Sequence, residues 1–197
     1  MFIQTETTPN PNSLKFLPGR DVSPGQALEF ASPDEAVASP LAEALFDVQG
    51  VARVFFGPDF IAVSRGDEAE RGWDQMKAPI LAAIMDHYVA GKPLMADGTS
   101  GASAAAAEGH NDAAYEGDAA QIVAEIKDLL DTRIRPAVAQ DGGDIVFDRF
   151  DPADGAVYLH MRGACSGCPS SSATLKAGVE NMLKHYVPEV TRVEQTL

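Results

Sequence analysis

Cysteine is almost absent from this chain of 197 residues, which contains only Cys165 and Cys168. A tetrahedral zinc site or an iron–sulfur cluster normally takes four protein ligands, and the irons of a cluster usually take thiolates. The chain therefore supplies at most half of such a site. The other half must come from a second copy of the chain or from ligands other than cysteine, unless the pair is a redox dithiol.

Basic side chains are also scarce, since 15 Lys and Arg stand against 29 Asp and Glu, for a net charge of −14. Proteins that bind nucleic acid neutralise phosphates with Lys and Arg, so this balance excludes nucleic acid as a partner. The acidic residues are spread along both halves of the chain. They are interpreted as a solvated acidic surface.

Long apolar runs are missing too, and none approaches the roughly 20 residues that span a bilayer, so no membrane association is expected. The first residues, 1–6, lack the basic start and apolar run of a signal peptide and the arginines of a transit peptide. A cytoplasmic location is therefore expected. In that reducing compartment a Cys-x-x-Cys pair is typical of catalysis or metal binding rather than of a structural disulfide.

Residues 96–117 predict a flexible linker between two domains. Of these 22 residues, 15 are Ala, Gly, Ser or Thr, and none is Lys or Arg. Such a stretch buries too little apolar surface to offset the entropy of ordering it. The expected domains are residues 1–95 and 118–197.

Both predicted domains combine strands with helices, so the expected fold class is α+β. In the first, Ser39 and Pro40 are a helix N-cap and first helical residue, and Pro79 either kinks a second helix or marks its start. In the second, a three-stranded sheet with two helices is expected. The predicted strands are 13–17, 27–30, 51–56, 60–64, 145–150, 156–162 and 190–196, with a hairpin turn at Gly57-Pro58-Asp59. The predicted helices begin near residues 40, 73, 122 and 172, and Pro136 is expected to strain or end the third of them.

The two cysteines fall where the strand at 156–162 gives way to the last helix. A helix N-terminus favours thiolate over thiol, and Gly163 and Gly167 permit a tight bend of the backbone. The thiols are expected on a loop outside the core. Gly142 and Gly143 are interpreted as terminating a helix, and Arg162, Lys176 and His87 are expected at the solvated surface.

Spacing alone leaves three interpretations of Cys165 and Cys168 open. A redox dithiol usually lies early in its domain beside an aromatic residue, whereas this pair lies late and encloses Ser166 and Gly167. Half a zinc site requires two more ligands, for which His160 and His185 are the nearby candidates. Half an iron–sulfur site requires two more thiolates, which a symmetric dimer supplies.

The flanking residues separate these interpretations. The run Asp141-Gly142-Gly143-Asp144, a hairpin, and then the run from Gly163 to Lys176 closely resemble the C-terminal domain of NifU, the module shared by Nfu iron–sulfur carrier proteins. Residues 8–16 and 73–88 resemble the N-terminal domain of the same proteins.

This resemblance implies a binding and transfer protein, not an enzyme. It implies a 4Fe–4S cluster held between the Cys-x-x-Cys motifs of two subunits, with Cys165 and Cys168 as the ligands in each chain. The implied partners are an upstream cluster donor, recipient apo-proteins and a second copy of the chain when the cluster is bound. A dithiol oxidoreductase and a zinc-bridged dimer are the alternatives.

Overall fold

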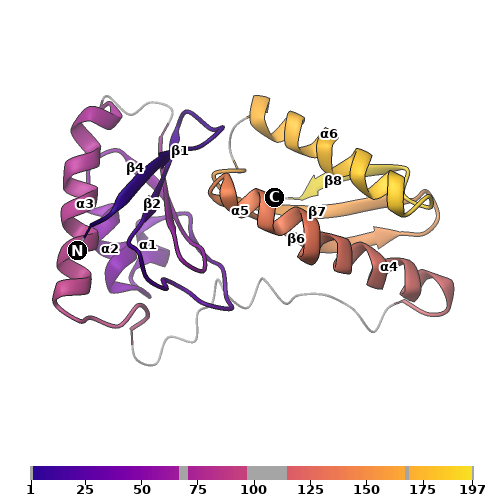
Figure 1. Ribbon diagram of the computed structural model, residues 1–197, viewed down its shortest axis with the longest axis horizontal. Helices are drawn as coiled ribbons and strands as arrows, with labels where there is room; N and C mark the ends of the chain where they lie inside the picture. The colour runs from indigo at the N-terminus through magenta and orange to yellow at the C-terminus, as the bar shows by residue number, and fades with distance from the viewer. Residues whose placement is uncertain (1, 67–70, 97–114, 167–168, 197) are drawn as a thin grey trace. The chain divides into compact units, whose positions relative to one another are not determined.

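The computed structural model describes residues 2–66, 71–96, 115–166 and 169–196, with the backbone alone for residues 169–172. The chain divides into two compact units, Met1–Ala107 and Glu108–Leu197. Each unit packs helices on a sheet, which confirms the α+β class (Figure 1). The central part of the predicted linker, residues 97–114, lies outside the described residues, so its flexibility and the exact domain limits stay predictions.

The first unit contains a five-stranded antiparallel sheet with the strand order β1-β2-β5-β4-β3. The strands β4 and β5 form the hairpin that Gly57-Pro58-Asp59 predicts, and Phe56 pairs with Ile61 beside the turn. The sequence pattern missed β1, which pairs with β2 along its whole length and has only partly buried or exposed residues. The strands are β1 Gln4–Thr7, β2 Ser13–Leu17, β3 Leu28–Phe30, β4 Val51–Phe56 and β5 Ile61–Arg65.

Three helices cover one face of this sheet: α1 Pro33–Ala36, α2 Pro40–Phe46 and α3 Trp73–Val89 (Figure 1). The predicted cap of α2 is confirmed, because Ser39 Oγ accepts a hydrogen bond from the Ala42 N–H and Pro40 begins the helix. Helix α3 begins six residues before Pro79, which therefore lies inside it.

His87 on α3 is buried, so the expectation that it lies at the surface is wrong. It follows Ile84 by three residues, and this helical spacing places it on the apolar face of α3. Among the residues that the structure describes, its Nδ1 finds no hydrogen-bond partner. Burial, together with the nearby Lys92 charge, lowers its pKa below the ordinary value.

The second unit begins with one long helical rod whose middle is a π-helical turn. It consists of α4 Asp118–Leu129, the π-helix η3 Leu130–Ile134 and α5 Arg135–Gln140. The Arg135 N–H bonds to the Leu130 carbonyl five residues earlier, and Pro136 follows directly. Pro136 thus strains the helix as expected but does not end it.

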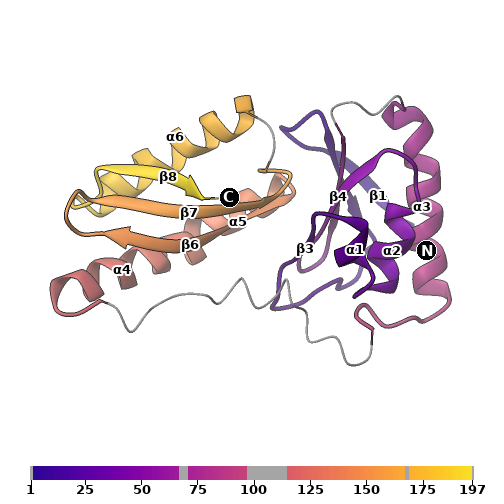
Figure 2. The ribbon, with the colours of Figure 1, turned by 180° about the vertical axis from the view of Figure 1, so that it is seen from behind.

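A three-stranded sheet and a last helix complete the second unit. Strand β7 lies between β6, which is antiparallel to it, and β8, which is parallel to it. Both helical segments lie on the same face of this sheet, which the reverse view shows from its other side (Figure 2). The elements are β6 Gly143–Asp151, β7 Ala156–Gly163, α6 Pro169–Tyr186 and β8 Arg192–Thr196.

The core of the second unit lies between this sheet and the helical segments. Its members come from every element, and they include Cys165. Among the described residues, no helix combines the length and apolar character needed to cross a bilayer.

Candidate metal centre

Cys165 is the only one of the two predicted ligands that the structure describes. It follows β7 by two residues and precedes the first residue of α6 by four, as the sequence predicts. Its side chain is only 6% exposed and belongs to the hydrophobic core. The expectation that the thiols lie outside the core is therefore wrong for Cys165, whereas Cys168 lies outside the described residues.

The turn that carries Cys165 is held by backbone hydrogen bonds. Gly163 has a φ of +65°, a conformation that glycine adopts without the steric cost of a Cβ. The Ala164 N–H donates to the Gly142 carbonyl at 3.1 Å. Both the N–H and the hydroxyl of Ser166 donate to the Gly163 carbonyl, at 3.1 and 2.9 Å. The Ala164 bond joins the end of β7 to the residue before β6, and the two Ser166 bonds close the turn itself.

Gly143 forms the wall behind the Cys165 thiol. A Cβ at this position would collide with Cys165 Sγ and lie 2.8 Å from the Arg162 carbonyl oxygen. The absence of a side chain is thus required by the close approach of the sulfur. Gly142, with a φ of +82°, follows the end of α5 as the sequence predicts, but Gly143 is already the first residue of β6.

A half-buried ion pair lies beside this wall. Asp144 is buried, and both of its carboxylate oxygens accept hydrogen bonds from Arg135, at 2.8 Å from Nε and 3.0 Å from Nη2. Arg135 Nη1 also donates to Asp131 Oδ1 at 2.9 Å. The hydrogen bond to Asp144, followed by the attraction of both carboxylates, raises the pKa of Arg135 above its ordinary value, so it stays charged.

The sequence prediction missed Arg135. The sequence marks Arg135 only as the residue before Pro136 within an apolar helix pattern. That position gave no reason to pair Arg135 with Asp144, nine positions away. Two other residues near the thiol, Arg162 and Lys176, were expected at the solvated surface, and this is wrong for Arg162. Arg162 is 4% exposed rather than solvated. Lys176 is partly exposed and pairs with Glu194 at 2.7 Å.

The two histidines proposed as zinc ligands form no three-ligand group with Cys165 in the described part of the chain. His160 lies in β7, and His185 lies near the end of α6 with its ring against Tyr186. Across the described ranges, no three His, Cys, Asp or Glu side chains gather in a way that could hold a metal ion. A site made within this part of the chain by Cys165 and both histidines is therefore not formed.

Comparison with known proteins gives matches in both units. Residues 3–91 match the family described as "Scaffold protein Nfu/NifU N terminal", and residues 126–194 match the "NifU-like domain". A solution structure of a NifU-like protein from Saccharomyces cerevisiae is 25% identical, with a TM-score of 0.43 over 49% of this chain and 85% of that one.

Relatives match along nearly the whole chain. "NifU-like protein 4, mitochondrial" of Arabidopsis thaliana is 53% identical over 99% of this chain and 66% of its own length. "NFU1 iron-sulfur cluster scaffold homolog, mitochondrial" of Homo sapiens is 48% identical over 100% of this chain and 72% of its own length. This chain thus spans about two thirds of the relatives' lengths. Because these relatives are described as mitochondrial, the expectation of a cytoplasmic location is wrong.

Proposed function

Because this chain belongs to the Nfu/NifU family of iron–sulfur cluster scaffold proteins, we propose that it carries a 4Fe–4S cluster between two copies of itself and transfers the cluster to apo-proteins. The resemblance in the sequence is thereby confirmed at the level of the family. The family is one of scaffold proteins, so the expectation that the chain is not an enzyme is confirmed as well.

The proposal rests chiefly on the number of thiols. A cubane cluster takes four thiolates, and the chain has two cysteines in all. Cys165 and Cys168 of two chains supply four, and a two-fold axis between the chains makes their contributions equal. The cluster is cargo in this scheme. Incoming thiolates of a recipient replace these ligands one at a time, and a site shared by two chains opens when the chains separate.

A ligand shared between two chains and a redox dithiol both require an accessible thiolate, and Cys165 is 6% exposed in the cluster-free chain. Its burial therefore does not separate the ligand role from the redox role. In the part of the chain that the structure describes, no grouping of three potential ligands offers zinc a site. The dithiol and the zinc-bridged dimer remain as outcomes of the test below.

Anaerobic reconstitution of the full chain with iron and sulfide tests the proposal. We expect a brown protein with a broad visible absorption band, and about one cluster per two chains by iron and sulfide analysis. Cys165→Ser and Cys168→Ser should each abolish stable binding, since each removes two of the four thiolates. A full-yield cluster in either variant would contradict the shared site. A colourless protein that reduces disulfides, or one that retains zinc at half an equivalent per chain, would favour the alternatives.

The state of association should follow the cluster. Two chains that each carry a charge of −14 repel one another, which favours a monomeric apo-protein at micromolar concentration. We expect the loaded protein to be a dimer that reverts to a monomer when a chelator strips the iron. Size-exclusion chromatography with light scattering measures both forms. A tight apo-dimer would mean that a protein interface holds the subunits, and a loaded monomer with a full cluster would require other ligands.

A further inference from the structure

The Cys165 thiol is shielded in the folded chain by the start of β6. Its sulfur packs so closely on Gly143 that no side chain fits there. A thiol that binds iron must reach the surface of its subunit, so the position of this wall decides how accessible Cys165 is. The contacts that hold residues 142–144 in place therefore bear directly on the thiol.

Residue 143 is held on two sides. Gly143 pairs with Gly163 at the end of β7, and the Gly142 carbonyl accepts the Ala164 N–H. The next residue, Asp144, accepts two hydrogen bonds from Arg135, one on each carboxylate oxygen. An arginine and a carboxylate joined through two parallel bonds fix direction as well as distance. This ion pair therefore joins the helical rod to β6 at the residue that follows Gly143.

The π-helical turn sets the direction in which Arg135 leaves the rod. Because the Arg135 N–H bonds five residues back, to Leu130, the turn contains one residue more than an α-helical turn. One additional residue rotates the following side chains by about 100° relative to an uninterrupted α-helix. The distortion before Pro136 thus coincides with the residue that reaches Asp144.

We propose that Arg135 and Asp144 are positioning residues for Cys165: their ion pair fixes the start of β6 as the wall behind the thiol and sets how far the thiol is shielded in the cluster-free protein. That this thiol is a cluster ligand rests on the proposed function. Loss of the ion pair should loosen residues 142–144 and expose Cys165 without unfolding the unit.

The experiment measures the reaction of Cys165 with a chromogenic disulfide in cluster-free protein. The full chain carrying Cys168→Ser has one thiol, so the signal reports Cys165 alone. We expect Arg135→Gln and Asp144→Asn to raise the reaction rate by about tenfold or more, since reaction follows local opening of the shielding contacts. Arg135→Lys keeps the charge but loses the paired geometry, so its rate should be intermediate.

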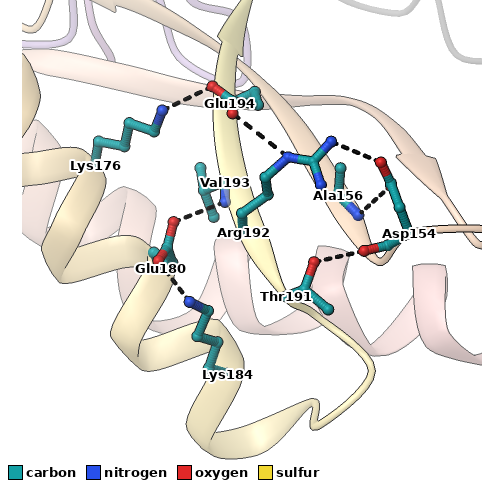
Figure 3. A network of polar contacts seen from close by, with 9 residues as sticks. All are labelled: Asp154, Ala156, Lys176, Glu180, Lys184, Thr191, Arg192, Val193 and Glu194. Carbon is teal, nitrogen blue, oxygen red and sulfur yellow. Dashed lines mark hydrogen bonds and ion pairs between the residues drawn. The ribbon is translucent and has the colours of Figure 1, made fainter.

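Arg192 provides a matched control in the same unit. Its side chain is 42% exposed, as that of Arg135 is, and it also bridges two carboxylates, those of Asp154 and Glu194 (Figure 3). It pairs with Ala156 at the opposite end of β7 from Gly163. Arg192→Gln should therefore leave the Cys165 rate within about twofold of the parent, because local opening at one end of a unit need not involve the other.

The outcomes are decisive in both directions. An unchanged rate in folded Arg135→Gln and Asp144→Asn would overturn the proposal. An equal increase in Arg192→Gln would also overturn it, since general destabilisation would then explain the result. If Arg135→Gln does not fold, the graded response of Arg135→Lys and Asp144→Asn decides.

The proposed function fails by a different measurement. If Cys165→Ser retained its cluster, the thiol would not be a ligand, yet the shielding by Arg135 and Asp144 would still be read from the reaction rates. If the cluster were lost and the rates were unchanged, the ligand role would stand and the positioning role would fall.

Discussion

At the scale of single residues, the closest constraint on the site is the missing side chain of Gly143. A Cβ there would meet Cys165 Sγ and the Arg162 carbonyl, and a backbone atom cannot move aside as a flexible side chain can. Gly143→Ala should lower the free energy of unfolding of the second unit by about 1–3 kcal/mol. Urea denaturation followed by circular dichroism measures the change.

Two references make this test specific. Gly178 in α6 has open space around an added Cβ, so Gly178→Ala should be neutral or stabilising through helix propensity. Trp73, the single tryptophan, reports on the first unit by fluorescence, and its transition should not shift. Equal stability of Gly143→Ala and the parent would show that the wall is not tight.

His87 makes the stability of the first unit depend on pH. Its pKa is lowered by burial in the folded chain, so the unfolded chain binds more protons as the pH falls through the ordinary value of 6.5. The free energy of unfolding should therefore be highest above this pH and should fall as the pH drops below it. The fall should stop once the pH passes the lower pKa that His87 has in the folded chain. His87→Gln should flatten the change in Trp73-detected stability between pH 7.5 and 5.5. His185 is exposed, so His185→Gln should leave this pH dependence unchanged. If His87→Gln also left it unchanged, the pH dependence would arise from another group.

At the scale of elements, a side chain makes hydrogen bonds to the backbone of each edge strand of the C-terminal sheet. The Tyr115 hydroxyl accepts the Phe150 N–H at 2.8 Å and donates to the Phe150 carbonyl at 2.9 Å, on the edge strand β6. Glu180 on α6 accepts the Val193 N–H of the other edge strand, β8, at 3.0 Å and pairs with Lys184 (Figure 3). Those two bonds lower the pKa of Glu180, so it stays an acceptor at neutral pH. Side-chain bonds of this kind to an edge strand hinder its pairing with another chain.

Removing the Glu180 carboxylate should loosen β8 locally. Glu180→Ala leaves the Val193 N–H without its acceptor, and a hydrogen bond contributes about 0.5–1.5 kcal/mol, which corresponds to a roughly 2–13-fold faster amide exchange. Hydrogen exchange read at Val193 by NMR measures it. Lys184→Ala removes only the exposed ion pair and should change this exchange little. Equal protection of Val193 in Glu180→Ala and the parent would show that the carboxylate does not hold the strand.

At the scale of the whole molecule, the two units should fold separately, since each has its own hydrophobic core. Residues 118–197 expressed alone should fold and take up cluster, and residues 1–95 should fold and bind none.

The hydrogen bonds of Tyr115 make a second prediction about such fragments. A fragment that begins at residue 108 should be more stable than one that begins at 118 by about 1–3 kcal/mol, since the shorter one loses both hydrogen bonds. Urea denaturation of the two fragments compares them, and equal midpoints would contradict a role for Tyr115.

Several features of this protein could be predicted from the sequence because they depend on neighbouring residues. The Ser39 cap, the hairpin at residues 57–59 and the place of Cys165 between a strand and a helix are set by turn chemistry and by periodicity within a few positions. The weak strand β1 and the short helix α1 were missed, because neither has an apolar period long enough to indicate it.

The sequence by itself determined that the chain has two thiols, that it consists of α+β units and that its motifs are those of the Nfu/NifU family. Only the tertiary structure decided that Cys165 is buried against Gly143, that Arg135 pairs with Asp144 and that Tyr115 makes hydrogen bonds to β6. The physical reason is that these contacts join residues 9 to 35 positions apart. Packing brings such residues together, and no local preference of the backbone specifies them.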